Sequence, residues 1–180
     1  MTISNGRLLV GDIGDNAGTR KSVRIYSVTE PTISLLKPDQ ILSLKAVTTS
    51  HTYPSGPRDA EALLVDPAGV PLIIDKLTGG VWNASGSGPM EKVANLGVSL
   101  VTGADLIPRG GGVLVRTYPF VYRLQPTGAV FSTVWKSTLS TVPSPLLPQA
   151  EAVCAGPDGS TGYTLSEARG KPVRIVAIRW

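Results

Sequence analysis

The chain has 180 residues, of which 42% are hydrophobic and 17% are charged, values typical of one globular domain with a sizeable core. Its formal net charge is +4 and its pI is near 9.4, but the basic residues are scattered and do not interleave with aromatic residues. This pattern argues against a nucleic-acid partner, and no apolar run reaches the roughly 18 residues that a membrane span requires.

Short apolar segments separated by turn residues predict strands along the whole chain. No window predicts a convincing helix, because the best candidate, ISLLKPDQILSLK, is interrupted by Pro38. The Pro-rich stretch 138–149 is expected to be a connector. We expect strands in four groups, namely 7–13, 22–29 and 41–49; 60–66, 71–76, 80–84 and 91–97; 101–107, 112–117, 120–125 and 130–138; and 149–155, 161–166 and 172–179.

One pattern recurs along the chain: a short strand with an acidic residue, a turn, and a second strand that ends in a charge. It reads DAEALLVDPAGVPLIIDK, VTGADLIPRGGGVLVRTY and QAEAVCAGPDGSTGYTLSE. When the copies are aligned on their turn glycines, Glu61 falls opposite Gly103 and Glu151, at intervals of about 42 and 48 residues. A period near 45 residues that consists only of short strands predicts the blades of a β-propeller.

We therefore predict an all-β fold, a β-propeller with about four four-stranded blades that form part of a larger ring. A single domain spans 1–180, with blades at about 1–58, 59–100, 101–148 and 149–180. By strand count three and a half blades are present, because the first group lacks its innermost strand and the last lacks its outermost. Open strand edges of such a ring would favour self-association.

The first strand of each propeller blade lines the central channel, so acidic residues on these strands are expected to converge. Asp105 lies two residues beyond the position of Glu61 and Glu151, which keeps it on the same strand face. The GDIGDN turn adds further oxygen ligands, although its spacing differs from that of an EF-hand loop. Carboxylates without thiolates suit Ca²⁺ or Mg²⁺ rather than zinc. The candidate metal ligands are Asp12, Asp15, Asn16, Glu61, Asp105 and Glu151.

A second set of residues is expected to contact a small polar ligand at the same end of the channel. This set is Arg58, Lys76, Arg116 and Glu167. Two plainer interpretations stay open: the acidic and basic residues form an ion-pair network along a polar wall, and the aspartates of the GDIGDN turn only accept hydrogen bonds from the loop backbone.

Nucleophilic catalysis has little support in the sequence. His51 is the only histidine and is expected on the surface, the lone Cys154 is expected to be buried, and no G-x-S-x-G motif occurs. We therefore favour a non-enzymatic binding or scaffold propeller whose acidic channel mouth holds a divalent cation or a small polar ligand. The alternatives are a metal-dependent hydrolase of a lactone, ester or phosphate ester, and a shortened remnant without function.

The strings LLVGDIGDNAGTR…VRIYSVTEP, YPSGPRDAEALLVDP, VTGADLIPRGGGVLVRTY and AEAVCAGPDG resemble a group of bacterial, largely actinobacterial, β-propeller proteins. Members of this group are compared loosely with lactonases and esterase-like phytases. The resemblance implies that further propeller sequence lies upstream, often behind an export signal, so that this chain is shortened at its N-terminus. As written, MTISNGRLLVGD contains no signal peptide, and the chain would remain in the cytoplasm.

Overall fold

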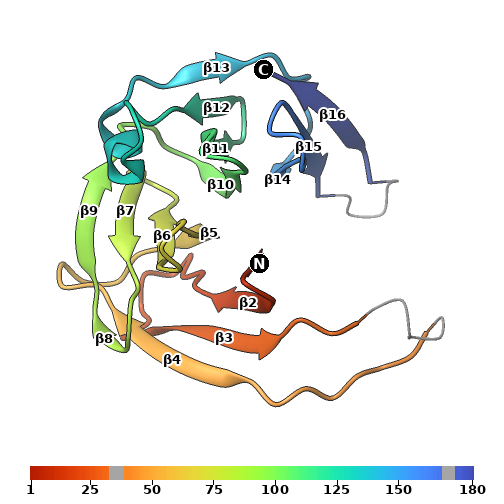
Figure 1. The fold of residues 1–180 in the computed structure, drawn as a ribbon. Coiled ribbons are helices and arrows are strands. Elements are labelled where there is room, and N and C mark those ends of the chain that lie inside the picture. Colours follow the sequence, from red (N-terminus) through yellow and green to blue (C-terminus); the bar gives the residue numbers. More distant parts are fainter. Residues whose placement is uncertain (33–38, 168–172) are drawn as a thin grey trace.

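The computed structural model describes residues 1–32, 39–167 and 173–180. The strands form four sheets, here called A to D, arranged like blades around a centre, with the first strand of each sheet innermost (Figure 1). This is the all-β, four-bladed propeller arrangement that the repeat predicted. Within the described residues, no helix is long and apolar enough to cross a membrane.

Sheet A consists of β1 (Thr2–Ser4), β2 (Arg7–Asp12), β3 (Val23–Thr29), β4 (Val47–Thr52) and, in parallel at its edge, β8 (Gly88–Pro89). The expectation that this group lacks an innermost strand was wrong, since β1 pairs with β2. The two-residue turn of this hairpin consists of Asn5 and Gly6, which both have positive φ. An Asn-Gly pair is the preferred sequence for such a turn. A three-residue strand carries too little pattern to be recognised in the sequence. The fourth strand starts at Val47, six residues later than predicted.

Sheet B consists of β5 (Ala60–Val65), β6 (Pro71–Asp75), β7 (Gly80–Asn83) and β9 (Glu91–Asn95). Both of its faces are covered: Leu63 and Ile73 pack toward sheet A, and Leu64 and Ile74 pack toward sheet C. Burial on both faces explains why these strands are almost continuously apolar rather than alternating.

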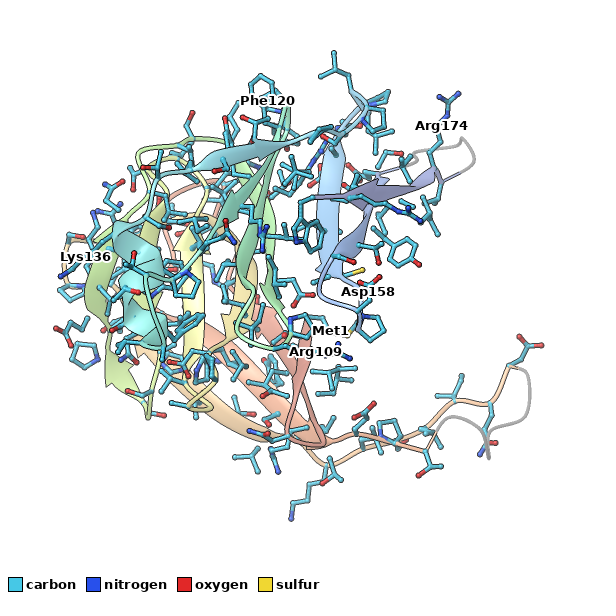
Figure 2. The ribbon with its side chains drawn as sticks, turned by 45° about the horizontal axis from the view of Figure 1, so that its top comes forward. Met1, Arg109, Phe120, Lys136, Asp158 and Arg174 are labelled. Atoms are coloured by element: carbon cyan, nitrogen blue, oxygen red, sulfur yellow. The ribbon has the colours of Figure 1, made fainter. Side chains whose placement is uncertain are left out.

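Sheet C consists of β10 (Val101–Ile107), β11 (Gly112–Thr117), β12 (Val121–Leu124) and β13 (Ser140–Val142). The predicted strand 130–138 was wrong, because Phe131–Lys136 forms a 3-10 helix, η2, at the periphery (Figure 2). Phe131, Val134 and Trp135 pack on the core between sheets B and C, a spacing that suits a helical turn and not a strand. The outermost strand β13 comes instead from the stretch expected to be only a connector.

Sheet D consists of β14 (Ala150–Ala155), β15 (Thr161–Ser166) and β16 (Ile175–Arg179). It therefore has three strands in the described part of the chain, as the strand count predicted; position 172, the predicted start of its last strand, lies outside the described residues. No described strand stands between sheet D and sheet A, so the ring is open on that side (Figure 1).

A β-bulge interrupts the first strand of sheets B, C and D at the same point. The pairing with the second strand skips Glu61 in β5, Thr102 in β10 and Glu151 in β14. Glu61 is therefore equivalent to Thr102 and not to Gly103, and Asp105 lies three residues beyond the bulge. The prediction was displaced by one residue because the turns used for the alignment differ in length, whereas bulges fix the register of the strands.

The same backbone hydrogen bond occurs in sheets B, C and D at the residue that follows the second strand. Its N–H donates to the carbonyl two residues before the bulge, from Lys76 to Asp59 (2.9 Å), from Tyr118 to Leu100 (3.1 Å) and from Glu167 to Gln149 (2.8 Å). Lys76, Tyr118 and Glu167 are thus equivalent. Arg116 pairs with Gly103, so its equivalents are Ile74 and Leu165, and it does not lie at the strand end that Lys76 occupies.

Candidate functional site

The three bulges and the three strand exits lie at one end of the ring, which we call the channel mouth. The bulges contribute Glu61, Thr102 and Glu151, and the exits contribute Lys76, Tyr118 and Glu167. In Figure 2 the labelled residues Phe120 and Arg174 mark this end, and Arg109 and Asp158 mark the opposite end. The repeat thus brings six side chains from three consecutive blades to the same end of the channel.

Four of these side chains form a chain of polar contacts, which we call the mouth network: Glu61, Lys76, Tyr118 and Glu151. Lys76 Nζ donates to Glu61 Oε1 at 2.5 Å and lies 5.4 Å from the centre of the Tyr118 ring. Tyr118 also lies close enough to Lys76 and to Glu151 to influence the pKa of both side chains. Lys76 Nζ is also 4.0 Å from Asp59 Oδ2. The network therefore links sheets B, C and D across the mouth.

The mouth network contains more carboxylates than ammonium groups, so its negative charge is only partly compensated. Burial would lower the pKa of Lys76, but its hydrogen bonds to Glu61 and Tyr118 outweigh this and raise the pKa, so the ammonium stays charged. Burial and the nearby charge of Glu61 raise the pKa of Glu151. Glu61 Oε2 is buried and has no hydrogen-bond partner among the described residues. With two glutamates facing one lysine, and Glu167 beside Glu151, the mouth is acidic.

The raised pKa of Glu151 gives a testable dependence of stability on pH. The folded state holds the Glu151 proton more tightly than the unfolded state, whose pKa is near 4.5, so the contribution of Glu151 to the free energy of unfolding falls as pH rises from 4.5 through the folded pKa. The Glu151→Gln variant lacks this titration. We expect urea unfolding to show the wild type losing stability relative to Glu151→Gln as the pH is raised from acidic to neutral.

Asp158 provides the control of opposite sign. Hydrogen bonds from the backbone N–H groups of Ser160 and Thr161 lower its pKa to about 2. Its contribution to the free energy of unfolding is therefore present above the unfolded pKa of 3.8 and is lost as the pH falls toward 2. The stability of the wild type relative to Asp158→Asn should therefore increase as the pH rises. A slope of the same sign for both variants would contradict the assignment for Glu151.

The aspartates of the GDIGDN turn mainly bind groups of the same loop. Asp12 forms a bidentate pair with Arg20, at 2.6 and 2.8 Å. The Asp15 carboxylate accepts the backbone N–H groups of Thr19 (3.0 Å) and Arg20 (2.9 Å), and Asn16 is exposed. These contacts match the plainer interpretation, in which such a turn satisfies its own backbone.

A cavity of about 350 Å³ beside the mouth network adjoins this turn. The Asp15 N–H donates to Asp59 Oδ1 at 2.6 Å, which ties the turn to sheet B near Lys76. Arg58, another residue of the cavity wall, lies 3.5 Å from Asp75 Oδ2 and stacks 4.9 Å from the centre of the Trp82 ring. Arg58 thus already pairs with a carboxylate.

Two further candidates lie away from the mouth, between sheets C and D. Asp105 Oδ2 accepts the Ala155 N–H at 2.9 Å, which joins the two sheets, and burial raises its pKa. Arg116 is fully buried and donates to Ser144 Oγ (3.4 Å) and to the Tyr118 carbonyl (3.3 Å). The prediction that Asp105 and Arg116 lie at the channel mouth assumed a strand register without the bulge at Thr102.

Of the six predicted metal ligands, the structure brings only Glu61 and Glu151 into one network. Among the described residues, no three Asp, Glu, His or Cys side chains group closely enough to hold a metal ion. His51 is buried on β4, with Nε2 2.8 Å from Thr49 Oγ1, so its expected surface position was wrong. Cys154 is exposed on sheet D, so its expected burial was wrong too.

Thr102 and Asp75 were missed by the sequence reasoning, and Tyr118 was not among the predicted site residues. Tyr118 and Thr102 stand at the positions of Lys76 and Glu61, and aligning the strand ends IIDK, VRTY and LSE would have found them. Asp75 is buried and accepts hydrogen bonds from Thr78 and, at 3.1 Å, from Trp82 Nε1. No local charge pattern marks Asp75 in the sequence, because its charged partner, Arg58, is 17 residues away along the chain.

The arrangement of blades defines the class of protein, a β-propeller, and solved structures agree with it. The chain is similar to a structure titled as a nidogen/laminin complex, with a TM-score of 0.58, 13% identity, and coverage of 96% of this chain and 62% of that one. It is also similar to a luciferin-regenerating enzyme, with a TM-score of 0.51, 14% identity, and coverage of 97% and 62%.

A third similar structure is the PQQ-bound aldose sugar dehydrogenase from Streptomyces coelicolor, with a TM-score of 0.47, 14% identity, and coverage of 90% and 59%. The chain thus spans about three fifths of the length of these structures. No family model matches the chain, and no curated protein matches it. At such identities the likeness shows the fold alone.

Proposed function

We propose that this protein is a non-catalytic binding propeller whose channel mouth takes up a small polar ligand that carries a positive charge. The observation that carries the proposal is Glu61 Oε2, a buried carboxylate oxygen that none of the described residues hydrogen-bonds, next to a second glutamate, Glu151. A buried acceptor without a partner is costly, so a donor or cation placed there would be bound favourably.

The charge of the mouth favours a cation over an anion. Lys76 compensates only one carboxylate, and it already contacts Glu61, Asp59 and Tyr118. Burial and the charge of Glu61 raise the Glu151 pKa, and a cationic group near Glu151 would offset both effects.

An organic cation fits the mouth better than a bare metal ion. Ca²⁺ takes six to eight oxygen ligands, whereas the mouth network supplies two carboxylates, and water would have to provide most of the rest. An amine needs only a few acceptors, which the glutamates provide. No observation of the described residues favours the hydrolase alternative specifically.

Thermal unfolding with 1,4-diaminobutane, Ca²⁺ or chelator tests the proposal. A ligand that binds only the native state adds RT ln(1 + [L]/Kd), about 2.7 kcal/mol at a hundredfold excess over Kd. We expect the diamine to raise the melting temperature clearly and Ca²⁺ to raise it less.

Matched variants separate binding at the mouth from a general effect of added cations. Glu151→Gln should abolish the shift, whereas Glu91→Gln, on the exposed outermost strand of sheet B, should retain it. A melting temperature that responds to neither probe would leave the mouth network as a purely structural ion-pair network and overturn the proposal.

A further inference from the structure

Sheet D presents an uncovered apolar face toward the open side of the ring. The strand register places five residues together on this face, which we call the leading face of sheet D: Ala152, Cys154, Tyr163, Leu165 and Ile175. Tyr163 is 47% exposed and Ile175 is 68% exposed. Exposed apolar residues grouped in this way commonly mark an interaction surface.

The same positions are buried where a next blade exists. In sheet B, the register makes Leu64 equivalent to Cys154, Leu72 to Tyr163 and Ile74 to Leu165. These residues of sheet B are almost completely buried in the core shared with sheet C. The leading face of sheet D is therefore built like a blade interface, and no sheet of the described residues covers it.

Sheet A carries the complementary kind of face on the other side of the opening. Leu9 and Ile25 point toward sheet B, so strand alternation turns their neighbours to the opposite side. We call this the trailing face of sheet A, and it comprises Ile3, Leu8, Val10, Tyr26 and Val28. Val10 is 41% exposed. Within the ring, each leading face is covered by the trailing face of the following sheet.

Charges at the end opposite the mouth favour the same pairing. Arg179 pairs with Thr161 next to the β14–β15 turn and lies on the strand face of Ile175. Glu30 follows β3, and its N–H donates to Gly6 in the β1–β2 turn at 2.9 Å. Both are exposed, and neither forms an ion pair within the described residues. Stacking sheet D on a sheet A would bring these opposite charges to the same end.

We propose that two copies of this chain associate head to tail, with the leading face of sheet D of one copy packed against the trailing face of sheet A of the next. The contact repeats the blade-to-blade packing seen between sheets B and C. Because the two faces differ, the interface is heterologous, and the dimer keeps one free leading face and one free trailing face for further contacts.

Two face variants and their mixture test the proposal. Ile175→Lys blocks the leading face and Val10→Lys blocks the trailing face, both at exposed positions that the fold tolerates. Light scattering after size exclusion, over a wide range of protein concentration, should show wild-type assemblies larger than a monomer and each variant alone as a monomer. An equimolar mixture of the variants retains one intact interface and should give a 1:1 dimer and nothing larger.

Leu146→Lys is the control, since Leu146 is exposed but belongs to neither face, and it should assemble like the wild type. The thiol of Cys154 gives a second readout, because its reaction with a maleimide should slow as the wild type assembles and should not slow for Ile175→Lys. A wild type that is monomeric at every concentration, a single variant that still dimerises, or a mixture that stays monomeric would each overturn the proposal.

Discussion

Replacing Lys76 with methionine is expected to lower the free energy of unfolding by about 2–3 kcal/mol at neutral pH, less than the roughly 3–5 kcal/mol cost of breaking a fully buried ion pair, because Glu61 is 25% exposed. The Lys76 side chain is only 13% exposed and touches Glu61, Asp59 and Tyr118. Without the ammonium, Glu61 and Asp59 would remain as uncompensated carboxylates in a partly buried site. Urea unfolding of the wild type and Lys76→Met, fitted with a common m-value, measures the loss.

The dependence of this loss on pH and on Glu61 shows whether it is electrostatic. At acidic pH the abandoned carboxylates can take up protons, so the loss should shrink. The double variant Glu61→Gln, Lys76→Met should recover a good part of the stability lost in Lys76→Met, because both charges of the closest pair are gone. An equal loss at acidic and neutral pH without recovery would mean that Lys76 acts through the packing of its aliphatic stem.

The blades were predictable because each needs an apolar strand on both sides of a turn, and that pattern survives in the sequence. The runs EALLV and PLIID, for example, become β5 and β6 almost residue for residue. The exceptions lie at the edges of the blades. β13 is a three-residue strand in a Pro-rich stretch, and η2 occupies an apolar run because tertiary packing, rather than strand propensity, decides its conformation.

The site was harder to predict because it depends on register. A bulge adds one unpaired residue to a strand and changes which side chains share a face. Glu61 and Glu151 were identified because both copies carry a glutamate at the bulge, whereas Thr102 and Tyr118 break the acidic pattern and were not among the predicted site residues. The position of Arg116 was predicted wrongly for the same reason.

Replacing Arg116 with methionine is expected to raise the free energy of unfolding by about 1–2 kcal/mol, since a buried charge replaced by an apolar side chain of similar volume often stabilises a fold. Arg116 is fully buried, the ion pairs of the described residues do not include it, and its Nε has no hydrogen-bond partner. Burial also lowers its pKa. The equivalent positions, Ile74 and Leu165, are apolar. Urea unfolding of both proteins measures the change.

Arg24→Met is the matched control, because Arg24 is exposed on β3 and its replacement should change stability by no more than about 0.5 kcal/mol. A loss of stability in Arg116→Met would contradict the expectation, and it would mean that the guanidinium is compensated by a group between sheets C and D. An anion bound there would make the wild type, but not Arg116→Met, more stable as chloride or phosphate is added. Equal responses of the two proteins to these salts would leave the hydrogen bonds to Ser144 and to the Tyr118 carbonyl as the source of the compensation.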